Sequence, residues 1–76
     1  MVQLTVPDLG EGIDKAQVVV WHAGEGDRVR QDDDIVELVT DKAVFQVPAP
    51  ADGILTAIKV RTGEDVAIGG VLGIID

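Results

Sequence analysis

Lys42 is the residue whose setting in this sequence is best suited to chemistry. It lies in the stretch VTDKAVFQVPAP, residues 39–50, between two strongly apolar runs. A reversal of the chain is expected there, and it would hold the ammonium clear of its neighbours. An amine presented in this way is a good substrate for an enzyme that must reach it. Lys15 and Lys59 lack this setting and are expected to be ordinary solvated side chains.

The apolar runs around the lysine define the register of the expected hairpin. If residues 41–42 are the centre of the turn, four apolar side chains share one face, which must be the core: Val36, Leu38, Phe45 and Val47. Neither central residue is glycine, so we expect a type I turn, which needs no positive φ.

The opposite face of the same hairpin carries Val39 and Val44, which should lie side by side next to Lys42. A cross-strand pair of this kind contributes only about 0.2–1 kcal/mol to stability. The two valines are therefore as well suited to docking a partner as to holding the hairpin together.

The rest of the chain is typical of short strands joined by turns. Apolar and polar residues alternate with period two in several segments, and no segment keeps helical spacing over several turns. The segments between them are rich in glycine, proline and aspartate: PDLGEG, AGEGD, QDDD, PAPADG, RTGED and IGG. The sequence therefore predicts an all-β fold.

An internal repeat divides the chain into two similar halves. At one constant offset, Gly26, Val29, Ile35 and Leu38 correspond to Gly63, Val66, Leu72 and Ile75. Nearer the start of each half, the sequence separation between corresponding residues is larger. The first half should therefore carry a few extra residues around positions 13–17. Two such units packed about an approximate twofold would share one core. The symmetry partner of the lysine turn is the chain end, so Lys42 should lie opposite the termini.

Size, composition and charge restrict the function. The 76 residues suit a single domain, 1–76, and the absence of cysteine excludes disulfides and thiolate metal sites. A formal net charge of −8 argues against nucleic acid as a partner. No long uncharged run suits a membrane span, and the start resembles neither a signal nor a transit peptide. We therefore expect a prokaryotic cytoplasm, or the mitochondrial matrix if the source is eukaryotic.

Three other kinds of site find little support. The aspartates at positions 32–34 point to alternate sides of an extended chain and have no calcium-loop spacing, so a solvated turn is expected. His22 has no serine or cysteine to activate anywhere in the chain, which excludes a hydrolytic triad. No GxGxxG segment precedes a helix, so a dinucleotide site is unsupported. Trp21 is expected in or at the edge of the core.

Five segments, in this order and spacing, carry a resemblance to a known family: VPDLGEGI, GDRV, TDKA, VPAPADG and GEDVAIGGVLGIID. The chain resembles a lipoyl domain of the dihydrolipoyl acyltransferase component of 2-oxoacid dehydrogenase complexes. The resemblance covers essentially the whole chain. It implies a flattened barrel-sandwich of two four-stranded antiparallel sheets, and a chain excised from the N-terminal end of a longer acyltransferase.

The resemblance also implies a cofactor and its partners. Lipoic acid would be joined to Lys42 by an amide, which removes one positive charge. The 2-oxoacid decarboxylase (dehydrogenase) component would reductively acylate the dithiolane, the acyltransferase core would pass the acyl group to coenzyme A, and dihydrolipoamide dehydrogenase would reoxidise the dithiol. A lipoate–protein ligase or lipoyl transferase would attach the group. The domain itself would be a non-catalytic, monomeric carrier, with pyruvate and branched-chain acids as leading substrates.

Recognition residues are expected on both sides of the lysine. By resemblance, Asp41 and Ala43 help the attaching enzyme to recognise the turn, although turn chemistry and close packing explain these two residues equally well. The loop after the first strand would lie close to the lysine, and Glu11 and Asp14 are its candidates for recognition by the decarboxylase. Many family members carry an acidic residue where Val39 stands, so partner specificity is open.

Three alternatives remain. Biotin carrier domains share the fold and the lysine hairpin, but place methionine on both sides of the lysine, unlike Asp41 and Ala43. The glycine-cleavage carrier protein is longer and has added helical segments. A barrel-sandwich interaction module with an unmodified Lys42 would lose little function when this lysine is changed.

Overall fold

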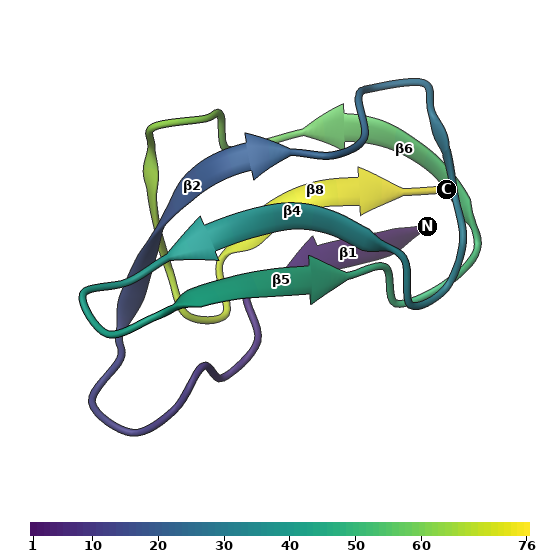
Figure 1. The fold of residues 1–76 in the computed structure, drawn as a ribbon. Coiled ribbons are helices and arrows are strands. Elements are labelled where there is room, and N and C mark those ends of the chain that lie inside the picture. The colour runs from purple at the N-terminus through teal and green to yellow at the C-terminus, as the bar shows by residue number, and fades with distance from the viewer.

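The computed structural model describes residues 1–76 and contains eight strands and no helix. The strands are β1 Val2–Thr5, β2 Lys15–Trp21, β3 Arg28–Val29, β4 Asp34–Val39, β5 Val44–Pro48, β6 Gly53–Ile58, β7 Asp65–Ala67 and β8 Val71–Ile75. They form two four-stranded antiparallel sheets, in the orders β1-β8-β6-β3 and β5-β4-β2-β7. The expected all-β sandwich of two sheets is confirmed (Figure 1).

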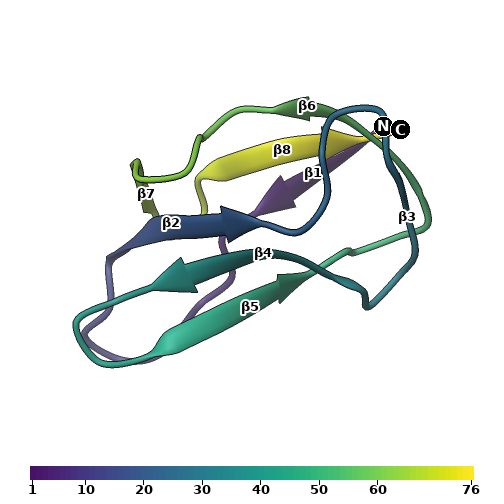
Figure 2. The ribbon, with the colours of Figure 1, turned by 45° about the horizontal axis from the view of Figure 1, so that its top comes forward.

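The two sheets are related by the approximate twofold that the repeat predicts. Strands β1, β8, β6 and β3 hold the same places in one sheet as β5, β4, β2 and β7 in the other, as Figure 2 shows. Gly26 and Gly63, which the repeat equates, have φ values of +93° and +92°. Only glycine adopts this region without strain, so the same turn is built twice.

The core lies between the sheets and is entirely apolar. It contains fourteen buried side chains and no buried polar or charged residue: Leu4, Val6, Ala16, Val18, Val29, Ile35, Val36, Leu38, Val47, Ala49, Leu55, Val66, Leu72 and Ile75. All six apolar residues that define the repeat belong to this cluster. Trp21 packs against its edge, as expected, and its Nε1 donates to the Val60 carbonyl at 2.9 Å.

The extra residues of the first half lie before β2. Lys15 and Gln17 pair with Ala67 and Asp65 in a regular ladder, so they cannot belong to an insertion. The connection between β1 and β2, residues 6–14, is longer than its symmetry equivalent between β5 and β6, residues 49–52. The expected position, 13–17, is therefore too far along the chain. We call residues 6–14 the first loop.

The register of the lysine hairpin agrees with the prediction. Val36 pairs with Val47, Leu38 with Phe45, and Val39 with Val44. Val36, Leu38 and Val47 are buried as expected. The prediction that Phe45 is a core residue is wrong. Its side chain is partly exposed and is not among those that pack against the core. It lies on β5, the edge strand of its sheet, which has no further strand beside it to cover the ring.

The termini and the lysine hairpin lie at opposite ends of the sandwich (Figure 1). The two chain ends lie side by side, because Val2 pairs with Ile75 and the Met1 ammonium is 3.6 Å from the Asp76 carboxylate. Asp32 and Asp33 lie in the exposed turn before β4, where Asp32 has a φ of +73°, and Asp34 is the exposed first residue of that strand. The structure contains no helix long and apolar enough to cross a bilayer.

Candidate functional site

The lysine turn connects the edge strand β5 to the central strand β4 at the tip of the hairpin. Thr40 N donates to the Ala43 carbonyl at 2.8 Å, and neither Asp41 nor Lys42 has a positive φ. The expected reversal at residues 41–42 is therefore present. Ala43 N donates to Thr40 Oγ1 at 3.1 Å, so a side chain closes the turn where a backbone carbonyl usually does.

Lys42 is exposed at this tip and makes no ion pair. The only ion pair in the structure is the one between the chain ends. The ammonium is not wholly free of neighbours, however, because it lies against the first loop. A Cβ added to Gly12 would be 3.1 Å from Lys42 Nζ. The Lys42 ammonium therefore lies close to Gly12 of the first loop.

The first loop contains Glu11 and Asp14, the two residues expected there to take part in recognition by the decarboxylase. Ile13 N donates to the Gly10 carbonyl at 3.3 Å, which places Glu11 and Gly12 at the centre of a turn. Glu11 and Asp14 are both exposed. The Asp14 carbonyl accepts a hydrogen bond of 3.0 Å from Ile68 N, which ties the end of the loop to the segment after β7. The loop lies beside the lysine, as the resemblance implies.

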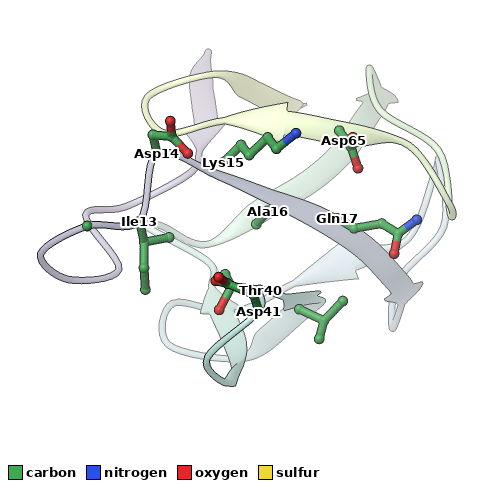
Figure 3. A pocket seen from close by; sticks show the side chains of 10 residues that line it. Ile13, Asp14, Lys15, Ala16, Gln17, Thr40, Asp41 and Asp65 are labelled. Atoms are coloured by element: carbon green, nitrogen blue, oxygen red, sulfur yellow. The ribbon is translucent and has the colours of Figure 1, made fainter.

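A groove of about 470 Å³ separates the end of this loop from the lysine hairpin. Figure 3 shows Asp14, Asp41 and Asp65 around it. Val39 also lines the groove, whereas Glu11 does not. The structure thus brings Asp14, Asp41 and Val39 together, and leaves Glu11 at the exposed turn of the loop.

Val39 and Val44 form the expected pair on the outer face of the hairpin. Val44 is 58% exposed, which is the largest exposure of any strand valine, and Val39 is partly exposed. Ala43 is exposed rather than closely packed, and both its backbone N–H and its carbonyl are used in the turn. The packing explanation for Ala43 is therefore wrong.

Two residues of the site were missed from the sequence. Thr40 bonds the turn through its hydroxyl, and Gly12 leaves room for the Lys42 ammonium beside the first loop. A threonine just before a two-residue turn is itself a recognised turn signal, because its hydroxyl bonds nearby backbone groups. No local signal indicates that Gly12 approaches Lys42, because the two are brought together by the fold.

Gly12→Ala is expected to change the environment of the Lys42 side chain, whereas the matched control Gly26→Ala is not. Gly12 has φ +82° and Gly26 φ +93°, so alanine at either position should destabilise the fold by about 1–2 kcal/mol. Only the Gly12 methyl would meet Lys42, since nothing lies within 4 Å of a Cβ at Gly26. Urea unfolding should therefore show similar losses, while NMR should show shifted Lys42 side-chain signals in Gly12→Ala alone. Unshifted signals would contradict the contact.

The chemistry available at this site is acylation of an amine. A primary amine that is exposed, without an ion-pair partner and carried on a tight turn meets the requirements of an acyl acceptor. The residues fit a covalently held cofactor whose carboxyl group forms an amide. Histidine, cysteine and acidic side chains nowhere gather into a group of three that suits a metal.

The comparison with protein families and known relatives agrees with this chemistry. The family model described as "Biotin-requiring enzyme" (Biotin_lipoyl) matches residues 2–75. The chain is 46% identical over 72 residues to the dihydrolipoyllysine-residue succinyltransferase component of the Escherichia coli K12 2-oxoglutarate dehydrogenase complex. It is 39% identical over 69 residues to the lipoamide acyltransferase component of the Pseudomonas aeruginosa branched-chain alpha-keto acid dehydrogenase complex.

These matches cover 95% and 91% of this chain, but only 18% and 16% of the relatives. The chain thus spans less than a fifth of the length of the curated relatives it matches. The first of these relatives belongs to a 2-oxoglutarate dehydrogenase complex, and the second belongs to a branched-chain alpha-keto acid dehydrogenase complex. The 2-oxoglutarate class is one that the motifs did not single out.

Two solved lipoyl domains have the same fold. The lipoyl domain of the Azotobacter vinelandii 2-oxoglutarate dehydrogenase complex has a TM-score of 0.79 and 34% identity, over 100% of this chain and 96% of that one. The lipoyl domain of the Escherichia coli succinyltransferase component has a TM-score of 0.76 and 46% identity, over 95% and 90%. The chain therefore belongs to the Biotin_lipoyl family and is a lipoyl domain in sequence and fold.

Proposed function

We propose that Lys42 carries lipoic acid through an amide bond. The amine nitrogen would attack the carbonyl carbon of an activated lipoyl group, such as an acyl adenylate. The ammonium first loses one proton to give the neutral amine; a C–N bond then forms, the C–O bond to the adenylate breaks with AMP as the leaving group, and the nitrogen gives up a second proton. The product has no charge at this position, so the net charge changes from −8 toward −9.

The observation that carries this proposal is the placement of the amine. Lys42 is exposed at the tip of a tight hairpin and has no ion-pair partner. It also lies at the end of the sandwich opposite both termini (Figure 2). A group attached there extends away from whatever chain joins the domain at its ends. Lys15 and Lys59 are not on the hairpin turn.

The domain's own part in the reaction is to position the lipoyl group on Lys42 and to present it to the partner enzymes. Lipoate supplies a disulfide that takes up acyl groups and reducing equivalents; the domain supplies reach and a surface for recognition. We propose that it is non-catalytic and serves the 2-oxoacid decarboxylase component, the acyltransferase core and dihydrolipoamide dehydrogenase in turn. A lipoate–protein ligase or lipoyl transferase would load it. Asp14, Asp41 and Val39, which line one groove beside the lysine, are the proposed recognition residues.

We further propose that the chain is one carrier domain of a longer acyltransferase. The small share of each relative that it covers supports this. The compartment is proposed to be a prokaryotic cytoplasm, or the mitochondrial matrix if the source is eukaryotic.

Reductive acylation tests the proposed function. The domain is treated with lipoate, ATP and a lipoate–protein ligase, and then with the decarboxylating component of a pyruvate, branched-chain or 2-oxoglutarate complex and its 2-oxoacid. Intact mass should increase by one lipoyl group and then by one acyl group with at least one component. The unlipoylated domain should gain no acyl group.

Biotin provides the control for the cofactor. Biotin, ATP and a biotin–protein ligase should leave the mass unchanged, because Asp41 and Ala43 replace the methionines that flank a biotinyl-lysine. Attachment of biotin in place of lipoate would overturn the proposal, as would acylation of the domain without lipoate.

A further inference from the structure

The hydroxyl of Thr40 bonds to three backbone groups of the lysine turn. Thr40 Oγ1 accepts from Lys42 N and from Ala43 N, each at 3.1 Å, and donates to the Ala43 carbonyl at 3.1 Å. A hydroxyl has one hydrogen to donate and two lone pairs to accept with, so its full capacity is used here. One of the three bonds is made to the backbone of the lysine itself.

This choice of side chain differs from that in the other turns. Elsewhere the side chains that accept from turn amides are carboxylates: Asp8, Asp27, Asp33, Asp52 and Glu64. An ionised carboxylate accepts but does not donate, so it could not also bond the Ala43 carbonyl. A carboxylate at position 40 would also place a further negative charge beside the Lys42 ammonium. The neutral hydroxyl of Thr40 fixes the turn without offering that amine an ion-pair partner.

We propose that Thr40 is a positioning residue for the lipoylation of Lys42, an inference that rests on the proposed function. The direction in which the amine leaves the hairpin depends on the backbone at residues 41–43. The hydroxyl bonds the two amides, Lys42 N and Ala43 N, that would otherwise be free to reorient. An attaching enzyme binds only the fraction of molecules whose turn is correctly formed, and a smaller fraction raises its apparent KM in proportion.

Three variants separate positioning from general stability. Thr40→Val keeps the shape of the side chain and removes all three bonds, whereas Thr40→Ser keeps the hydroxyl. Thr56→Val is the matched control, because exposed Thr56 on β6 donates a hydroxyl bond to the Ile74 carbonyl at 3.3 Å in the sheet that does not contain the lysine hairpin.

The kinetic test uses lipoate, ATP and a lipoate–protein ligase with each variant as substrate. Thr40→Val should raise KM by at least about tenfold, the lower end of the effect expected from losing the net contribution of three hydrogen bonds, with kcat within about twofold of wild type. Thr40→Ser and Thr56→Val should both stay within about twofold in KM. An unchanged KM in Thr40→Val, or an equal rise in Thr56→Val, would overturn the inference.

Amide hydrogen exchange provides a readout that does not depend on the ligase. In Thr40→Val the amides of Lys42 and Ala43 should exchange faster, while that of Leu38 in the core strand keeps its rate. Unchanged exchange at both turn amides would overturn the role of Thr40 even if the domain is lipoylated. Failure of the wild-type domain to accept lipoate would instead refute the proposed function, and the exchange data would still decide whether the hydroxyl orders the turn.

Discussion

Lys42→Arg is expected to abolish lipoylation completely and to leave the fold intact. Arginine keeps the positive charge and the length of the side chain, but its guanidinium is not acylated under the conditions that acylate an amine. Because Lys42 is exposed and makes no ion pair, the free energy of unfolding should change by no more than about 0.5 kcal/mol. Intact mass after treatment with ligase, and urea unfolding, measure the two effects.

The remaining lysines provide the control for this variant. Lys15→Arg and Lys59→Arg change exposed residues outside the hairpin turn and should be lipoylated like the wild type. A Lys42→Arg protein that still gains a lipoyl group, or that loses several kcal/mol of stability, is incompatible with a carrier lysine. An unmodified interaction module would instead bind its partner equally well with arginine at this position.

Leu38→Ala is expected to have the largest effect on stability in the hairpin. Leu38 is fully buried on the central strand β4, and truncating such a leucine costs about 2–5 kcal/mol, including the cavity that it leaves. At roughly 0.05–0.15 kcal/mol per residue, the whole domain is stabilised by only about 4–11 kcal/mol. Thermal or urea unfolding should therefore show a variant that is partly unfolded or close to it.

Phe45→Ala is the paired comparison, because Phe45 faces Leu38 across the ladder. Its ring is partly exposed on the edge strand, so only part of its transfer free energy is lost and no closed cavity forms. We expect a loss of about 1–2 kcal/mol, below the range for a fully buried aromatic residue. A larger loss for Phe45→Ala than for Leu38→Ala would mean that the ring is covered in solution.

The fold and the hairpin register were predictable because they follow from periodic patterns. Alternation of apolar residues determines which side chains enter the core, and a slip of one residue would expose Val36 and Leu38. The repeat predicted the twofold, and the matching φ values at Gly26 and Gly63 show how closely the two halves agree. These features depend on residue type and spacing, which the sequence states directly.

The errors concern features that depend on the neighbours a residue acquires in space. Alternation places Phe45 on the inner face, but it does not reveal that β5 is an edge strand. The change in sequence separation between corresponding residues of the two halves shows how many extra residues the first half has. The strand pairing at Lys15 is needed to place them before β2. The contact between Gly12 and Lys42 joins segments thirty residues apart, and nothing local to either one encodes it.

Peptide mapping of the wild-type domain after treatment with lipoate, ATP and a lipoate–protein ligase tests the central claim most directly. The chain has three lysines, at positions 15, 42 and 59, so the modified peptide identifies the site. We expect one lipoyl group per molecule, all of it on the peptide that contains Lys42. A lipoyl group on Lys15 or Lys59, or a domain that remains unmodified, would contradict the account.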